Sequence, residues 1–297
     1  MNILLLITKG EIGGAQTSIL NLAIKLKEEN QKITVGFGQG DFLSKKLKER
    51  NIPYVRFKYL DRSYSPLKNL KFLKEFITFT DKNKFDVIHL NSTNTLVAAI
   101  GSKISKTKPK VIFTFRGLSL IDPLYAKSAI NKFFYKIIFK IFLKFVDEQV
   151  YVSNENRDMA KKIGLTKNYH VIYNGLPDLT DNFFPKEKAR QLLSSKLNIN
   201  IQNYFLIGSV GRLAYQKNYE FLIKQIKKIV SKNSQIKCII IGSGPEESKL
   251  KTIINDEKLE NQIYLTGDII DAWRYFKAFD IFALTSRYEG LSITLLE

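Results

Sequence analysis

One pattern repeats along most of the 297 residues: a short apolar run, a loop, and a segment with helical spacing. It begins with the run ILLLIT (3–8), the glycine loop KGEIGG, and a segment that places Ile19, Leu22, Ala23 and Leu26 on one helical face. A continuous apolar run of this kind is typical of a parallel strand covered on both faces. Its alternation with helices predicts a doubly wound α/β domain.

The first α/β domain is predicted to cover residues 1–172. Further strands are expected at KITVGFG, FDVIHLNS, KVIFTFRG and EQVYVS, and further helices at LKNLKFLKEFITF, TLVAAIGSKI and about residues 127–146. The pattern breaks over residues 173–200, where Gly175, Pro177 and Pro185 interrupt a stretch with neither period. This stretch is therefore predicted to be a linker.

The alternation resumes over residues 201–297. Strands are expected at YFLIGSVG, IKCIIIGSG, QIYLTG and DIFALTS, and helices at NYEFLIKQIKKIV, ESKLKTIINDEKL and DAWRYFKAF. This second α/β domain is expected to be incomplete, since a closing helix should follow Leu291. Two such domains are expected to bind a ligand at the carboxyl ends of their parallel strands.

The charge balance favours an anionic partner. The chain has 47 basic and 28 acidic residues, for a formal net charge of +19. Such a charge suits nucleic acid, an anionic membrane surface or a phosphorylated ligand, although lysines on solvated helices would also explain it. The single cysteine, Cys238, excludes an intrachain disulfide and a cysteine-cluster zinc site. Neither a signal peptide nor a membrane-spanning run is apparent, so we expect a cytoplasmic protein.

Two cations flank a strand-to-helix turn in GSVGRLAYQKNYEFLI. Arg212 follows a predicted strand, and Lys217 precedes a helix for which Asn218 is the expected N-cap. A cation beside a helix N-terminus opposes the helix dipole. An anion held by Arg212, Lys217 and the helix amides would explain the position of Lys217. The alternative is that Lys217 is a solvated surface lysine.

Two glycine turns also precede helices. IIIGSGPEESKL places Gly242 and Gly244 at a strand end, with Pro245 expected at the first helical position. These glycines suit either close approach of a ligand or a tight turn. Gly13 and Gly14 lie in KGEIGGAQ, whose spacing is not that of a dinucleotide-binding fingerprint.

Two carboxylates close the sequence in RYEGLSITLLE. Glu289 is expected in the loop after the last strand. Glu297 is expected about one and a half turns into a helix with Ser292 as N-cap. Such a pair could bind the hydroxyls of a polyol, and two surface carboxylates are the alternative.

Three features of the second half resemble, in order and spacing, the retaining GT-B glycosyltransferases of glycosyltransferase family 4. They are Arg212 with Lys217, the stretch IIIGSGPEESKL, and Glu289 followed by Glu297. The stretches GGAQTSILNLA, DVIHLNS, VYVSNENRDMA and VIYNGLP are similar to landmarks of that family's first half. The resemblance covers essentially the whole chain and implies two Rossmann-like domains. A basic protein that binds nucleic acid or another anionic polymer, and a sugar-nucleotide epimerase of this architecture, are the alternatives.

The resemblance implies transfer of a sugar, with retention, from a nucleotide-diphosphate sugar to a saccharide or lipid-linked acceptor. Arg212 and Lys217 would hold the diphosphate, Glu289 would lie near the donor sugar, and Glu297 would contact the ribose. The other implied donor-binding positions are Gly13, Gly14, Gly211, Gly242, Gly244, Gly290, Leu291, Ser292 and Ile293. No D-x-D motif is present, so neither a metal nor another cofactor is expected, and nucleic acid is not an expected partner.

The chain departs from the family pattern at two positions. Arg116 stands where the family usually carries histidine, and Asn91 where a second histidine often follows His89. Arg116 cannot act as a general base, but it could bind an acidic acceptor or a donor phosphate. His89 suits either the acceptor side or the core, and Asn174 is a further acceptor-side candidate.

Residues 128–146 combine lysines at every fourth position, from Lys132 to Lys144, with phenylalanine, isoleucine and leucine. The apolar arc that remains is wider than one packed helical face requires. One interpretation is a helix on an anionic membrane, at the inner face of the plasma membrane near a lipid-linked acceptor. The other is a core helix whose lysines extend to solvent.

Overall fold

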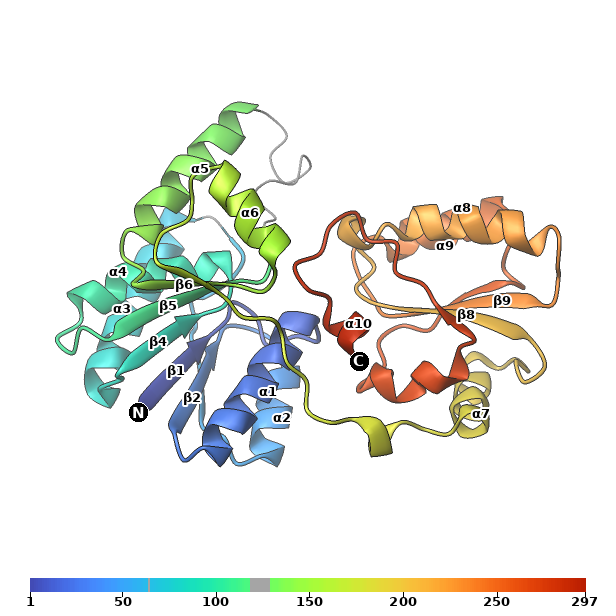
Figure 1. The fold of residues 1–297 in the computed structure, drawn as a ribbon, viewed down its shortest axis with the longest axis horizontal. Helices are drawn as coiled ribbons and strands as arrows, with labels where there is room; N and C mark the ends of the chain where they lie inside the picture. The colour runs from blue at the N-terminus through green and yellow to red at the C-terminus, as the bar shows by residue number, and fades with distance from the viewer. Residues whose placement is uncertain (64, 118–128) are drawn as a thin grey trace. The chain divides into compact units, whose positions relative to one another are not determined.

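The computed structural model describes residues 1–63, 65–117 and 129–297, and of residues 129–135 and 180 only the main chain. The chain forms two compact units (Figure 1). The first comprises residues 1–175 and 290–293, and the second comprises residues 176–289 and 294–297. Each unit contains a parallel sheet with helices on both faces, which confirms the predicted α/β class.

The first unit contains a seven-stranded parallel sheet in the order β3-β2-β1-β4-β5-β6-β7. Its strands are β1 (Asn2–Leu6), β2 (Lys32–Phe37), β3 (Tyr54–Arg56), β4 (Val87–Leu90), β5 (Lys110–Phe115), β6 (Glu148–Tyr151) and β7 (Tyr169–Val171). The sequence predicted five of these strands. It missed β3 and β7, which lie at the two edges and are too short to form an apolar run.

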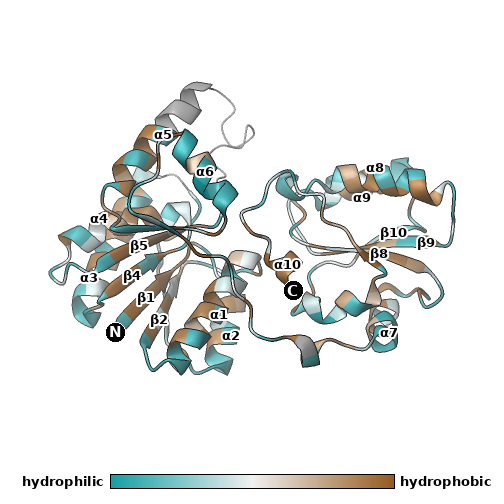
Figure 2. Cartoon of the chain, in the orientation of Figure 1, coloured by the Kyte–Doolittle hydropathy of each residue, from teal (hydrophilic) through white to brown (hydrophobic). Residues whose placement is uncertain are grey.

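Within the described residues of the first unit, six α-helices cover the two faces of this sheet. Helices α1 (Gly14–Glu28) and α2 (Phe42–Glu49) lie on one face, and α3 (Pro66–Asn83), α4 (Val97–Ile104), α5 (Ala129–Leu143) and α6 (Asn154–Lys162) on the other. The strands are largely apolar, as Figure 2 shows, because both faces are buried. No helix within the described residues is long and apolar enough to cross a membrane.

The second unit has a smaller sheet of four parallel strands in the order β10-β9-β8-β11. The strands are β8 (Phe205–Val210), β9 (Ile236–Ile241), β10 (Ile263–Leu265) and β11 (Ile281–Phe282). Helices α8 (Tyr219–Val230) and α9 (Glu247–Asp256) cover one face, and α7 (Lys186–Leu197) with the 3₁₀ helix Ala272–Ala278 covers the other. A short helix, α10, spans Ile293–Leu296.

Helix α7 lies within the stretch predicted to be a linker, so the prediction of irregular structure there is wrong for residues 186–197. Its buried apolar side chains include Ala189 and Leu193, which are four positions apart. Arg190, only 6% exposed, fixes the helix to the second unit through an ion pair of 2.7 Å with Asp280.

Asn218 is the N-cap residue of α8, as predicted, but it adopts a left-handed conformation (φ 54°) and its side chain makes no capping hydrogen bond. Other predicted helix boundaries need correction. Pro245 lies two residues before the first residue of α9 rather than at that position. The segment DAWRYFKAF forms a 3₁₀ helix, and Glu297 lies just beyond α10 instead of inside a longer helix.

We predict that Arg190→Ala destabilises the second unit by about 3 kcal/mol, because it leaves Asp280 and three carbonyl oxygens without their buried donor. The single tryptophan, Trp273, lies in this unit, so its fluorescence during urea unfolding reports the change. Gln191→Ala, an exposed substitution on the same helix, should leave the midpoint nearly unchanged. Equal midpoints for the two variants would contradict this role of Arg190.

Candidate active site

The cations of the second unit follow its strand β8. Arg212 is two residues beyond the strand and is exposed, with no ion pair to any residue that the structure describes. Lys217 ends the 3₁₀ turn Tyr215–Lys217 that leads into α8. The end of β8, the 3₁₀ turn and the start of α8 therefore place both cations within a segment of six residues.

Lys217 and Glu289 form the central ion pair of this region. The distance between Lys217 Nζ and Glu289 Oε1 is 2.7 Å, and the two side chains are 14% and 25% exposed. The hydroxyl of Ser286 donates to the same carboxylate oxygen at 2.6 Å. The structure thus brings together two predicted site residues that are far apart in sequence.

Gln216 holds the loop that carries Glu289. Its side-chain nitrogen donates to the carbonyl of Tyr288 at 3.0 Å and to Glu289 Oε2 at 3.4 Å. Its main-chain carbonyl accepts from the amide of Arg287 at 2.8 Å. Sequence analysis missed Gln216 and Ser286, because neither belongs to a recognisable motif. Their only signal was proximity in sequence to Lys217 and Glu289.

Gly242 and Gly244, two glycines of the second unit that were predicted to bind the donor, lie where two turns pack against each other. Gly242 has a φ of +143°, and a Cβ there would lie 2.1 Å from the carbonyl oxygen of Gly211. A Cβ at Gly244 would lie 2.3 Å from the carbonyl oxygen of Leu213. Close packing of the main chain therefore accounts for these glycines, and their contact with a donor stays a prediction.

The segment Gly290–Ile293 belongs to the first unit. The side-chain amide of Asn156 donates to the carbonyl of Gly290 at 3.0 Å, and that of Asn174 donates to the carbonyl of Leu291 at 3.0 Å. Ser292 and Ile293 are buried. Two asparagines thus hold the main chain of a segment for which the family resemblance implies donor contacts.

The start of α1 also touches this segment. Gly13 occupies the N-cap position and Gly14 the first helical position. A Cβ at Gly14 would lie 3.5 Å from Cγ1 of Ile293, an ordinary van der Waals distance. Both glycines therefore lie at the predicted helix start, and Gly14 contacts one of the predicted donor-binding residues.

His89 lies in the middle of the first sheet, on β4. Its Nε2 is 2.7 Å from the hydroxyl oxygen of Thr114 on β5. Burial, with a smaller effect from the charge of Arg116, lowers the pKa of His89 to about 3. The imidazole is therefore neutral at physiological pH. This environment favours the core role among the two roles considered for His89.

Glu297 lies in the second unit and is partly buried. Burial, together with the nearby charge of Asp271, raises the pKa of Glu297 to about 7. At pH 7 the carboxyl group of Glu297 is therefore present in both its neutral and its ionised form. Among the described residues, no group of three or more histidine, cysteine, aspartate or glutamate side chains is placed to hold a metal ion.

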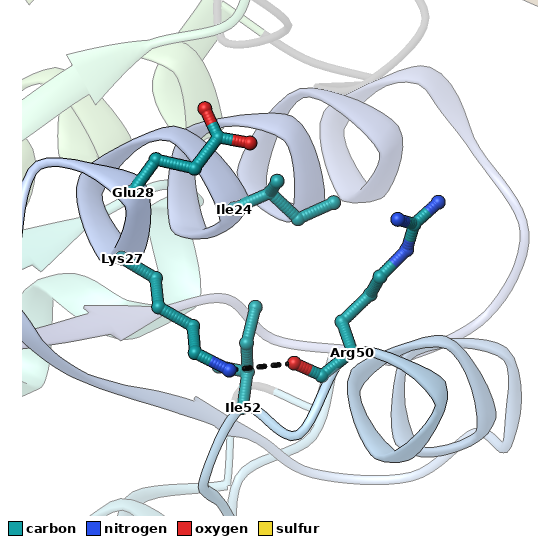
Figure 3. A pocket seen from close by; sticks show the side chains of 5 residues that line it. All are labelled: Ile24, Lys27, Glu28, Arg50 and Ile52. Carbon is teal, nitrogen blue, oxygen red and sulfur yellow. Dashed lines mark hydrogen bonds between the residues drawn. The ribbon is translucent and has the colours of Figure 1, made fainter.

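The first unit has a hollow of about 280 Å³ (Figure 3). It is lined by Ile24, Lys27, Glu28, Arg50 and Ile52, near the carboxyl ends of α1 and α2. The ammonium group of Lys27 donates a hydrogen bond of 2.8 Å to the carbonyl oxygen of Arg50. None of the residues predicted to bind a substrate lines this hollow.

We predict that the neutral state of His89 makes stability depend on pH. The folded pKa of about 3 lies below the unfolded value of 6.5, so the unfolded state binds the extra proton between these values. Stability should fall by up to about 1.4 kcal/mol per pH unit as the pH drops below 6.5. Urea unfolding at pH 7 and pH 5, with His89→Gln beside the exposed His170→Gln, measures it. His89→Gln alone should lose part of the pH dependence; equal curves for the two variants would contradict the assignment.

Two models of glycosyltransferase families match this chain. Residues 12–178 match the model of Glycosyltransferase Family 4, and residues 192–297 match that of Glycosyl transferases group 1. An uncharacterized glycosyltransferase of Methanocaldococcus jannaschii is 28% identical over 84% of this chain and 59% of its own length. The UDP-Gal:alpha-D-GlcNAc-diphosphoundecaprenol alpha-1,3-galactosyltransferase of Escherichia coli is 28% identical over 80% of this chain and 61% of its own length.

Solved structures share the fold. HepE of Anabaena, solved in complex with UDP and glucose, has a TM-score of 0.80 at 22% identity, covering 98% of this chain and 76% of that one. The chain thus has the GT-B architecture, while it spans about three fifths of the length of the first curated relatives (59% and 61%). The match over residues 12–178 covers more than half of the 297 residues. The protein therefore belongs to glycosyltransferase family 4.

Proposed function

We propose that this chain provides the donor and acceptor units of a retaining glycosyltransferase. The enzyme moves a sugar from a nucleotide-diphosphate sugar to a saccharide or lipid-linked acceptor, in the synthesis of a surface polysaccharide or glycolipid. The names of its relatives support this substrate class. They include the diphosphoundecaprenol galactosyltransferase, an O-antigen biosynthesis glycosyltransferase of Escherichia coli, and the alpha-monoglucosyldiacylglycerol synthase of Streptococcus pneumoniae.

The observation that carries the proposal is the ion pair of Lys217 with Glu289 beside the exposed Arg212. An ammonium group held at 2.7 Å from a carboxylate is already oriented and partly desolvated. Arg212 is free of other described ion pairs and can turn toward a phosphate. Together they present two positive charges to a diphosphate, with charge-assisted hydrogen bonds.

These cations act on the bond that breaks. When the anomeric carbon leaves the diphosphate oxygen, the bonding electron pair stays with the diphosphate, whose negative charge therefore grows. Arg212 and Lys217 stabilise this developing charge, because they are in place before the reaction begins. Glu289 orients the donor sugar through hydrogen bonds from its hydroxyls. The acceptor hydroxyl oxygen forms the new bond with retention at the anomeric carbon, and its proton passes to the departing diphosphate oxygen.

The remaining donor contacts are proposed from the resemblance to glycosyltransferase family 4. We assign the ribose hydroxyls to Glu297, whose ionised form accepts two hydrogen bonds. The main-chain amides of Gly290–Ile293 face the sugar and phosphate, and Gly13 and Gly14 contribute to this side. The glycine turns at Gly211, Gly242 and Gly244 allow the nucleotide to approach the main chain.

We predict that Arg212→Ala lowers the transfer rate by roughly 10²–10³, the usual effect of losing one preorganised donor to a developing charge. The same variant should weaken nucleotide binding in calorimetric titrations with UDP, GDP and ADP. Arg50→Ala removes an exposed arginine from the hollow of Figure 3 and serves as the control of equal charge change. Near-normal turnover in Arg212→Ala would contradict the role of Arg212. Binding of single-stranded RNA without any nucleotide diphosphate would overturn the enzyme assignment.

We also propose that α5 rests on the inner face of the plasma membrane, near a lipid-linked acceptor. Phe139, Leu143 and Val146 face the core of the first unit. The opposite side exposes Ile137, Ile138 and Ile141, which are 38%, 47% and 48% exposed. Lys136, Lys140 and Lys144 lie among these isoleucines, and such a basic, apolar surface suits an anionic bilayer. Of the segment 128–146 for which a membrane helix was predicted, residue 128 and the side chains of residues 129–135 lie outside the described part of the structure.

We predict that the double variant Ile138→Glu with Ile141→Glu reduces flotation with phosphatidylglycerol vesicles about tenfold or more, since it removes buried apolar area and adds two like charges. Ile229→Glu, on α8 of the second unit and 39% exposed, changes a similar lysine-flanked isoleucine and should float like the unsubstituted chain. Equal flotation with phosphatidylglycerol and phosphatidylcholine vesicles would end the membrane proposal.

A further inference from the structure

Arg116 carries a charge that no carboxylate among its described partners neutralises. It is the first residue after β5, and its guanidinium bonds to the side chains of Ser18, Asn91 and Asn174. All three partners are neutral. Burial lowers the pKa of Arg116 to about 10, which still leaves it positively charged at neutral pH. A partly buried charge held by neutral oxygens requires a reason.

Most of the donors of this guanidinium are already in use. Nε and Nη2 donate to Asn91 Oδ1 at 3.3 and 2.8 Å, while Nη1 donates to Asn174 Oδ1 at 2.7 Å and to Ser18 Oγ at 2.5 Å. An arginine side chain has five N–H groups, so these four bonds leave one. Direct recognition of a phosphate or carboxylate by two parallel bonds would require breaking this network.

The network determines how two side-chain amides are oriented. A guanidinium only donates, so both asparagines must turn their oxygen toward Arg116 and their NH₂ group away. The NH₂ group of Asn91 then donates to the carbonyl of His89 at 3.1 Å. The NH₂ group of Asn174 donates to the carbonyl of Leu291 at 3.0 Å. With the opposite orientation, Asn174 would present its oxygen to that carbonyl, and the bond would be lost.

The main chain of Arg116 meets the same segment. A Cβ at position 290 would lie 2.3 Å from the carbonyl oxygen of Arg116, so only glycine fits there. The side-chain amide of Asn156, which is 2% exposed, donates to the carbonyl of Gly290. Residue 116 therefore reaches residues 290 and 291 by two routes, directly through its main chain and indirectly through Asn174.

We propose that Arg116 is a positioning residue that orients Asn174 and thereby holds the segment Gly290–Ile293 in its binding conformation. The inference rests on the proposed function in one respect: that this segment presents main-chain amides to the donor. An irregular segment needs such support, because a loop that must be ordered at each binding event weakens the affinity by the cost of that ordering. Arginine serves at this position because it enforces one amide orientation, whereas a histidine nitrogen can donate or accept.

Hydrogen exchange in the unliganded chain tests the positioning itself, without any assumption about the donor. Arg116→Ala should speed exchange in peptides covering residues 288–296 about tenfold, as should Asn174→Ala, and the double variant should add little. Exchange over β4 and β5 should stay unchanged, which separates positioning from general loosening of the sheet. Arg50→Ala is the control. Unchanged exchange at residues 288–296 in both single variants would overturn the proposal.

Nucleotide affinity then tests the consequence for binding. With whichever of UDP, GDP or ADP binds the unsubstituted chain, each single variant should raise Kd about tenfold and the double variant no further. Additive losses would instead show that Arg116 contacts the ligand directly, and would overturn the proposal. Arg116→Lys should recover part of the affinity, since an ammonium group also only donates.

The two proposals can fail separately. If no nucleotide binds the unsubstituted chain, the proposed function fails, while the exchange experiment still decides the role of Arg116. If Arg116→Ala does not fold, Asn174→Ala removes the same connection at its other end and leaves Arg116 bonded to Asn91 and Ser18. Unchanged exchange in Asn174→Ala would then overturn the inference.

Discussion

Parallel strand pairing is the constraint on which the rest of this molecule depends. Because all strands of a parallel sheet end at the same edge, residues that follow different strands gather there. In the second unit Arg212 follows β8, Gly242 follows β9, and Glu289 follows β11. In the first unit Asn91, Arg116 and Asn174 follow β4, β5 and β7 in the same way. The sheets thus gather side chains that the sequence keeps far apart.

The buried or half-buried charges of the two units are balanced in different ways. Arg190 has a carboxylate partner and carbonyl oxygens, so it serves to dock α7 on the second unit. Lys217 has Glu289 as its partner and lies five residues after the exposed Arg212, in the region that we propose binds a diphosphate. Arg116 has only neutral partners among the described residues, and its charge orders two amides instead. The partners of each cation therefore distinguish docking, binding and positioning.

The outcome of the sequence predictions follows from how local each signal is. The long central strands were predictable from apolar runs such as ILLLIT and KCIIIG, because both faces of these strands are buried. The short edge strands β3 and β7 have no such run. Helix α7 was missed because its docking depends on Arg190, and the partner of that residue, Asp280, lies 90 positions away. The start of α8 after Asn218 was predicted correctly, whereas that of α9 was misplaced because Pro245 lies in a turn before the helix rather than at its first position.

The sequence by itself determined the alternation of strands and helices, the division into two α/β units, and the order of Arg212, Lys217, Glu289 and Glu297. These features follow from local periodicity and from the spacing of motifs along the chain. Only the tertiary structure decided that Lys217 pairs with Glu289, that His89 is neutral beside Thr114, and that Asn174 connects Arg116 to Leu291. Each of these depends on distance and burial between residues remote in sequence, and such contacts leave no trace in spacing along the chain.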